Sequence, residues 1–427
     1  MKTKLLIFGI TGDLGVRKLL PALEQIINNT GFDDLSVIGA SRREVDRAEL
    51  FVNCQNKDFL DGKLSVFKMD LANLDDYIKL RQFVNLGDDE QMVIYLAVPP
   101  QATSQIVDFL GEAGINAPNV KILFEKPFGV DLASAQQLIS QSERYFKEEQ
   151  IYRIDHYLAK EMAQNIVAFR GRNALFSGIW SNNFIESIDV VALETLDIEG
   201  RAQFYEHTGA LRDFVQGHLM QLAILALMDI PHDFEWNEMP DLRLAALKQI
   251  ESVSARGVIR AQYEGYRDEV GNPNSKVETF VSLKLVSSQP KWLGVPITLT
   301  TGKALSESKT EIRVKLKKTN GAESNNLIFK IQPNEGIDIE LFAKKPGYGK
   351  SFESNKLSFN YPVGTDLPDA YEQVIVDAIL SQKSLFTRNE EVIQSWRILQ
   401  PVLDDWASDQ SEIKIYPKGS SAESVLA

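Results

Sequence analysis

The first 155 residues alternate between short apolar runs and amphipathic segments, and this alternation limits the folds open to the chain. The apolar runs, which we expect to be strands, lie at residues 4–9, 35–40, 64–69, 92–97, 120–124 and 151–154. Strands separated by helices form a doubly wound parallel sheet, whose ligands bind outside the carboxyl ends of the strands. The alternation therefore predicts a Rossmann-like α/β dinucleotide-binding domain over residues 1–155.

A glycine-rich turn joins the first predicted strand to the first predicted helix. The turn residues that we expect to contact a cofactor are Gly9, Thr11, Gly12, Asp13 and Leu14. The N–H groups and the dipole at a helix N-terminus favour a pyrophosphate, and glycine lets the backbone approach it closely. The spacing is Gly-x-x-Gly-x-x-Gly rather than the common Gly-x-Gly-x-x-Gly, so a plain tight turn is the alternative.

Arg42 and Arg43 follow the second predicted strand, where a dinucleotide fold meets the adenosine ribose. Guanidinium groups match a phosphate in forked geometry, so we expect NADP, whose ribose carries a 2′-phosphate. Glu44 keeps NAD open as a weaker alternative, and an exposed basic helix start is the other interpretation. Pro99 and Lys126 follow later strands, so both would line the same crevice unless Lys126 is an ordinary surface residue.

Residues 151–160 carry a cluster of chemically active side chains directly after the sixth strand. Asp155, His156, Tyr157 and Lys160 supply an acid, an imidazole, a phenol and an ammonium. His156 and Lys160 are four residues apart, so on a helix they share one face, and that face suits a phosphate. The alternative is a solvated helix start, because a short motif alone is only a hypothesis.

From about residue 185 the sequence becomes rich in β-type runs. These runs lie at residues 185–195, 253–261, 278–285, 297–301, 311–317, 327–331 and 337–343, and helices are predicted at 370–381 and 390–406. Strands separated by turns rather than helices form antiparallel sheets. We therefore predict a second, α+β domain over residues 156–427, built on a large, mainly antiparallel sheet.

A strongly apolar helix is predicted over residues 209–228, and it carries His218. Phe214, His218 and Gln221 fall on one face at positions i, i+4 and i+7. A histidine on such a face is more often a core residue, but Asp155 offers an acid that could orient it.

Composition excludes several classes of protein. A length of 427 residues indicates two domains, and a net charge of −13 argues against nucleic acid and anionic membranes as partners. Cys54 is the single cysteine, which fits a reducing compartment, and with four histidines it leaves little for a metal site. No apolar run reaches the ~20 residues of a membrane helix, so we expect a cytoplasmic protein.

Six short motifs are spread over most of the chain: Gly9-x-x-Gly12-Asp13-Leu14, Glu125-Lys-Pro-Phe-Gly, Arg153-Ile-Asp-His-Tyr-Leu-x-Lys160, Arg212-Asp-x-x-Gln-x-His218, Gly302-Lys-Ala-Leu305 and Gln332-Pro-Asn-Glu335. Through these motifs the chain resembles the glucose-6-phosphate dehydrogenases over most of its length. Each motif is short, but six in the family's order, each on the expected type of element, are highly specific.

The resemblance implies roles for individual residues. His218 would be the general base that takes the proton of the C1 hydroxyl of glucose 6-phosphate, and Asp155 would orient it. The residues implied to hold the sugar phosphate are His156, Tyr157, Lys160 and Lys303. The residues implied to contact the sugar ring are Lys126, Glu194, Asp213 and Gln332. On sequence alone, Lys303 and Gln332 read as ordinary surface residues.

The implied reaction is oxidation of D-glucose 6-phosphate by NADP to 6-phospho-D-glucono-1,5-lactone, the entry step of the oxidative pentose phosphate pathway, without a metal. The resemblance also implies a homodimer or homotetramer. A dehydrogenase for another hexose or amino-sugar phosphate and a non-catalytic NADP-binding regulator are the alternatives. The chain departs from the family pattern at Ile10, which would crowd the glycine turn, at Gly217, which would loosen the backbone before His218, and at Ser308, where a cation is usual.

Overall fold

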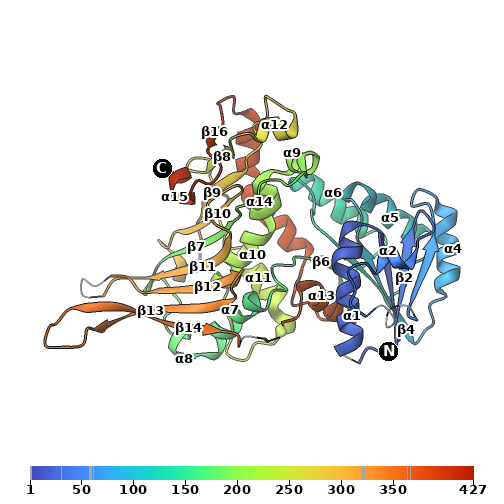
Figure 1. The fold of residues 1–427 in the computed structure, drawn as a ribbon, viewed down its shortest axis with the longest axis horizontal. Helices are drawn as coiled ribbons and strands as arrows, with labels where there is room; N and C mark the ends of the chain where they lie inside the picture. The colour runs from blue at the N-terminus through green and yellow to red at the C-terminus, as the bar shows by residue number, and fades with distance from the viewer. Residues whose placement is uncertain are drawn as a thin grey trace.

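The computed structural model describes residues 2–29, 31–56, 60, 62–319, 323–362, 364–365 and 367–427. Two bodies lie side by side, an α/β domain that holds the N-terminus and a larger domain built on a broad sheet (Figure 1). Both predicted fold classes are confirmed. Within the described part of the chain, no helix has both the length and the hydrophobicity needed to cross a membrane.

The first domain contains a seven-stranded sheet in the order β15-β6-β5-β4-β1-β2-β3. Six of its strands are parallel and match the predicted runs: β1 (Lys2–Phe8), β2 (Leu35–Ser41), β3 (Leu64–Lys68), β4 (Glu90–Leu96), β5 (Val120–Phe124) and β6 (Ile151–Ile154). β5 and β6 are buried throughout, because helices cover both faces of a parallel sheet.

Helices connect these strands: η1 (Gly15–Leu19), α1 (Leu20–Asn29), α2 (Arg47–Leu50), α4 (Leu74–Val84), α5 (Pro100–Glu112), α6 (Leu132–Ser142) and the turn η2 (Glu148–Gln150). Their starts follow from local chemistry. Asp131 accepts a hydrogen bond from the Ser134 backbone and so caps α6, while Pro100 begins α5, where a missing N–H costs nothing.

A C-terminal segment returns to the first domain. The helix α13 (Ala370–Ile379) packs against α1 and η1, and β15 (Phe386–Thr387) pairs antiparallel with β6 as the edge strand of the first sheet. The long helix α14 (Asn389–Ser408) then leads back into the second domain. The division at residue 155 stays a prediction, and residues 370–387 belong with the first body although they come late in the chain.

The second domain contains a nine-stranded sheet in the order β14-β13-β12-β11-β7-β10-β9-β8-β16. Its strands are β7 (Ile185–Leu193), β8 (Ile259–Tyr263), β9 (Phe280–Leu285), β10 (Ile297–Gly302), β11 (Lys309–Leu316), β12 (Asn326–Gln332), β13 (Gly336–Lys344), β14 (Phe352–Asn360) and β16 (Lys414–Tyr416). Pairing is antiparallel except for β7 with β10 and β8 with β16. β14 was not predicted from the sequence, because all nine of its residues are exposed and no burial pattern marks them.

Three helices pack against this sheet: α7 (Glu161–Arg172), η3 (Leu211–Leu219) and α10 (Met220–Leu227). The helices α9 (Ala202–Ala210) and α11 (Met239–Leu247) pack in turn against η3 and α10. Shorter pieces lie at its margins: α8 (Ala174–Ser177), η4 (Trp236–Glu238), α12 (Tyr266–Val270), η5 (Pro290–Trp292) and α15 (Ala422–Leu426). The single helix predicted over 209–228 is wrong in detail. Gly209 has a positive φ of 66° and kinks the helix, and residues 211–219 are π-helical.

Candidate active site

His218 and Asp155 meet at the junction of the two domains. Asp155 follows the carboxyl end of β6, and His218 lies on η3. The His218 Nδ1–H donates to Asp155 Oδ1 over 2.7 Å, and the Tyr157 backbone N–H donates to the same oxygen over 3.0 Å. Both side chains are at least 93% buried. This bond leaves Nε2 of His218 as the nitrogen that can accept a proton.

Lys126 completes the cluster, and Gly217 makes room for it. The Lys126 ammonium lies 2.9 Å from Asp155 Oδ2 and 3.1 Å from His218 Nδ1. A Cβ added to Gly217 would lie 1.6 Å from the Lys126 Nζ. The expectation that Gly217 merely loosens the backbone therefore misses its steric effect, since any larger residue displaces Lys126.

The electrostatics of this cluster suit a proton acceptor. Burial by itself raises the pKa of Asp155, but its contacts with His218 and Lys126 outweigh that effect and hold the pKa well below its usual range. Burial lowers the pKa of His218, although the Asp155 carboxylate opposes the shift. His218 is therefore a neutral imidazole near neutral pH, hydrogen-bonded to a charged carboxylate.

His156 and Tyr157 lie against the His218 ring, and Lys160 lies over the Tyr157 ring. The His156 ring lies 4.6 Å from that of His218, and burial, followed by the charge of His218, lowers the His156 pKa to about 3. The Lys160 Nζ lies 5.7 Å from the centre of the Tyr157 ring. Gln332, at the end of β12, donates its side-chain amide to the Tyr157 hydroxyl over 3.3 Å, so the large sheet also contributes a residue to the cluster.

Glu194, Lys303 and Asp213 form a second group. The Lys303 Nζ is 2.6 Å from Glu194 Oε2 and lies over the rings of Tyr205 and Phe214. Phe214 also lies 5.6 Å from the His218 ring, which links this group to His218. Asp213 has a buried carboxylate oxygen without a hydrogen-bond partner among the described residues, so it is an available acceptor.

The predicted cofactor turn is built for close approach. Gly9 has a φ of +80°, and a Cβ there would lie 2.2 Å from the Ala97 carbonyl oxygen. The turn is closed by a hydrogen bond from the Gly12 N–H to the Gly9 carbonyl of 2.8 Å. Ile10 does not crowd the turn as expected, because its side chain points into the core, where a Cβ on Gly39 would lie 2.6 Å from it.

The remaining predicted cofactor residues occupy the same edge of the sheet. Thr11, Asp13 and Leu14 lie in the turn between β1 and η1, and Pro99 lies between β4 and α5. Arg43 is tied to Glu49 by an ion pair. Arg42 is exposed and makes no ion pair with any residue that the structure describes, so its guanidinium is free for a ligand.

Comparisons with known proteins give the chain a family. Residues 6–165 match the family described as "Glucose-6-phosphate dehydrogenase, NAD binding domain", and residues 167–425 match "Glucose-6-phosphate dehydrogenase, C-terminal domain". The chain belongs to the glucose-6-phosphate dehydrogenase family. A relative from Chlamydia muridarum, named glucose-6-phosphate 1-dehydrogenase, is 35% identical over 97% of this chain and 92% of its own length. A relative of that name from Bacillus subtilis is 33% identical over 98% and 94%.

Solved structures agree with this assignment. A structure described as glucose-6-phosphate dehydrogenase in complex with its substrate glucose-6-phosphate superposes with a TM-score of 0.94 at 28% identity, covering 100% of this chain and 97% of the other. A glucose-6-phosphate 1-dehydrogenase from Mycobacterium avium superposes with a TM-score of 0.87 at 30% identity, covering 98% and 94%. This dehydrogenase is therefore an oxidoreductase whose first domain is of the type that binds a nicotinamide dinucleotide.

The third departure from the dehydrogenase pattern has a structural counterpart. The Ser308 hydroxyl accepts a hydrogen bond from the Thr195 N–H over 2.8 Å, which fixes the chain beside Glu194. Lys309 is paired with Glu307 at 3.0 Å. Neither residue supplies a free cation to the cluster.

Sequence reasoning missed the aromatic and buried neighbours of this dehydrogenase site. Tyr371 on α13 stacks against His156 with ring centres 6.4 Å apart, and no local pattern signals that a helix more than 200 residues away returns here. Glu125 accepts a hydrogen bond of 2.5 Å from Tyr95, and burial raises its pKa to about 7. Its place in the Glu-Lys-Pro motif was a signal that could have identified it.

Proposed function

We propose that this dehydrogenase oxidises D-glucose 6-phosphate at C1 with NADP, with His218 as the base. The observation that carries the proposal is the 2.7 Å bond between His218 and Asp155, which lies beside His156, Tyr157 and the Lys160 ammonium and at the carboxyl edge of the dinucleotide-binding sheet. These two residues are 63 positions apart in sequence, so only the fold unites them.

The chemistry follows from the arrangement. Bound NADP supplies the hydride acceptor. Oxidation of the C1 hydroxyl also releases a proton, which His218 Nε2 accepts because its other nitrogen is held by Asp155. The Asp155 carboxylate stabilises the resulting imidazolium. Lys126 neutralises Asp155 before substrate binds and is close enough to turn towards a sugar hydroxyl instead.

The sugar phosphate would lie against His156, Tyr157 and Lys160. The Tyr157 phenol stays protonated, since burial raises its pKa to about 12, so it donates a hydrogen bond rather than repelling the phosphate. Lys303 is the fourth implied phosphate ligand, but it is already engaged by Glu194. It would have to share its charge between that carboxylate and the substrate.

The test of the base is His218→Asn. Turnover, followed by NADPH absorbance, should fall by about 10³-fold or more, because removal of a general base costs roughly 10²- to 10⁴-fold. Binding of glucose 6-phosphate should persist within a few-fold. The matched control is His207→Asn, since His207 is an exposed histidine on α9 bonded only to the Gln203 carbonyl. Wild-type turnover in the His218 variant would contradict the proposal.

A panel of sugar phosphates tests the substrate. We expect glucose 6-phosphate to give the largest kcat/KM, and a higher value with an amino-sugar or galactose 6-phosphate would favour the alternative reaction. The absence of NADPH formation with every member of the panel would instead indicate a non-catalytic NADP-binding regulator.

We further propose that Arg42 selects NADP over NAD through the 2′-phosphate. Its guanidinium is exposed and unpaired among the described residues, whereas Arg43 is held by Glu49. The variant Arg42→Ala should raise the KM for NADP by roughly 10- to 100-fold, the value of one charged contact of about 1.5–3 kcal/mol. The KM for NAD should change less than three-fold, and an equal loss for both cofactors would refute the role.

We also propose a homodimer or homotetramer that associates through the second sheet. The β13–β14 hairpin extends away from the body of the molecule (Figure 1) and exposes large apolar side chains: Leu341, Phe352, Leu357 and Phe359. Such a patch on a monomer is unusual. Light scattering should give at least twice the chain mass, and Phe352→Ser should shift it towards the monomer.

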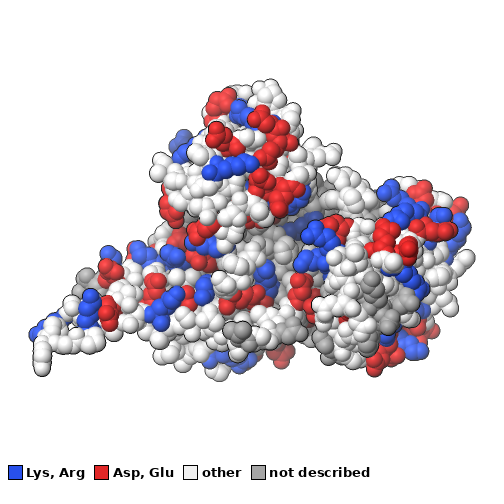
Figure 2. Space-filling view, viewed as in Figure 1, with Lys and Arg blue, Asp and Glu red and all other residues white. Residues whose placement is uncertain are grey.

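The charge distribution offers no basic tract for nucleic acid on the face seen in Figure 2, where acidic and basic side chains are interspersed. We propose a cytoplasmic location on the basis of the single cysteine, Cys54, which is buried. Cell fractionation with an antibody to this chain would test it, and recovery outside the cytoplasm would refute it.

A further inference from the structure

A cavity lies at the end of the first sheet that faces away from the candidate active site. Its volume is about 640 Å³, within the range of ordinary ligand pockets. One wall comes from the amino ends of β5 and β6, at Lys121 and Ile151, and the other from residues 381–390 of the returning segment. Lys126 and Asp155 follow the opposite ends of the same two strands.

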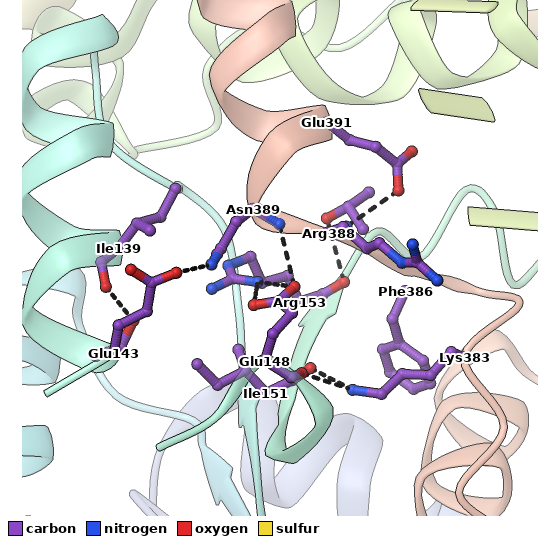
Figure 3. Close-up of polar contacts among 12 residues, drawn as sticks. Ile139, Glu143, Glu148, Ile151, Arg153, Lys383, Phe386, Arg388, Asn389 and Glu391 are labelled. Atoms are coloured by element: carbon purple, nitrogen blue, oxygen red, sulfur yellow. Dashed lines mark hydrogen bonds and ion pairs between the residues drawn. The ribbon is translucent and has the colours of Figure 1, made fainter. Parts of the chain in front are cut away.

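Two lysines project into this cavity. The Lys383 ammonium donates to the Ile151 and Glu148 carbonyl oxygens over 2.6 and 3.2 Å (Figure 3) and lies 3.4 Å from the centre of the Tyr152 ring. The Lys121 ammonium, on a side chain with only 9% exposure, lies 5.9 Å from the same ring. Both cations therefore gather around one phenol ring.

Neither lysine is in direct contact with a carboxylate among the described residues, although the charges of Glu148 and Glu149 partly offset the effect of burial on the pKa of Lys383. Glu148 is committed to Arg153, with bonds of 3.0 and 3.1 Å, and to the Asn389 N–H over 3.1 Å (Figure 3). Glu149 and Glu390 line the rim, where they are exposed to solvent. Across the ranges that the structure describes, no ion pair reaches Lys121 or Lys383.

Buried cations that make no direct ion pair carry an electrostatic cost that a bound anion would reduce. Burial lowers the pKa of Lys121 to about 8 and that of Lys383 to about 7, which reflects the same cost. The hydrogen bonds to neutral carbonyls offset only part of it, because a charged acceptor is roughly twice as strong.

We propose that this cavity is a second ligand site that binds a phosphate group, free or on a small metabolite, between Lys121 and Lys383. The site also touches α13, since Lys121 donates to the Ala378 and Ile379 carbonyls at the end of that helix, over 2.6 and 3.0 Å. The first turn of α13 carries Tyr371, which stacks on His156. A ligand bound here would influence the active site through this helix, which is ~15 Å long.

Calorimetry on the full chain tests the site, with inorganic phosphate and 3-phosphoglycerate as probes at constant ionic strength. We expect the phosphate Kd to weaken at least ten-fold in Lys383→Gln and in Lys121→Gln. The matched control is Lys315→Gln, which removes a surface lysine paired with Glu186 on the second sheet and should leave the Kd unchanged. Tighter binding of 3-phosphoglycerate than of phosphate would identify a metabolite as the occupant, and the reverse would identify free phosphate.

Two further measurements guard against misfolded variants. Lys383→Arg keeps the charge and should retain phosphate binding within about three-fold. In the wild-type protein, phosphate should slow acetylation of Lys383 at least five-fold, as read by mass spectrometry, and leave Lys315 unaffected. The proposal is overturned if the wild type binds no phosphate, or if Lys383→Gln binds it as tightly as the wild type. Phosphate bound at His156, Tyr157 and Lys160 would be insensitive to Lys383, so this outcome is independent of the proposed reaction.

Discussion

Replacing Gly217 with alanine should raise the pKa of the His218 imidazole, the proposed base. The new Cβ would lie 1.6 Å from the Lys126 Nζ, so the flexible lysine must move. Lys126 now lies 3.1 Å from His218 Nδ1 and disfavours protonation of that ring. Once it has moved, the Asp155 carboxylate faces His218 without this competing charge.

The size of the shift follows from Coulomb's law. With an effective dielectric constant of about 20, charges 3.1 Å apart interact by roughly 5 kcal/mol. A displacement to about 6 Å would roughly halve this interaction, which corresponds to an upper limit of ~2 pKa units. Because water will enter the space and screen the charges, we expect a rise of about 1 unit.

Nitrogen NMR of labelled histidines, with His218 assigned by mutation, would measure this pKa directly, and the acid limb of the kcat/KM profile should move to higher pH with it. In a Lys126→Met background, Gly217→Ala should cause no further shift. Gly178→Ala is the matched control, since a Cβ at Gly178 meets nothing within 4 Å. An unchanged or lowered His218 pKa in the Gly217 variant would refute the reasoning.

Two predictions concern stability. The pKa of His156 is about 3 in the folded protein and ~6.5 when unfolded, so the unfolded chain binds more protons between these values, and stability should fall as the pH drops below about 6.5. Denaturant unfolding at several pH values should show that the free energy of unfolding falls by up to ~1.4 kcal/mol per pH unit in the wild type and by less in His156→Asn. An equal fall in both proteins would contradict a lowered pKa of His156 in the folded protein. Arg243→Met should lower the free energy of unfolding by roughly 3–5 kcal/mol, because it leaves the buried Glu391 carboxylate without its cation. Arg313→Met, which breaks an exposed pair with Glu311, should lower it by less than about 1 kcal/mol. Similar costs for both would show that burial does not set the value of these pairs.

The sequence by itself determined the helices and strands and the edge of the first sheet at which the polar site residues lie. Apolar runs end where strands end, so the bounds of β5 and β6 at 120–124 and 151–154 were predicted without error. Because parallel strands share one carboxyl edge, the glycine turn, Arg42, Lys126 and Asp155 could be assigned to one crevice. The polar types and the family motifs then supplied the reaction.

Tertiary structure alone decided the contacts between distant parts of the chain. Three such features cannot be read from the hydrophobic periodicity of the sequence: the space at Gly217 for the Lys126 ammonium, the return of α13 to His156, and the π-helical backbone that carries His218. Periodicity records which side of an element is buried and not what it is buried against. β14 escaped prediction for the same reason, since a strand exposed on every residue has no buried side. The lysine-lined cavity likewise exists only because residues 381–390 pack beside β5 and β6, which lie more than 200 residues earlier in the sequence.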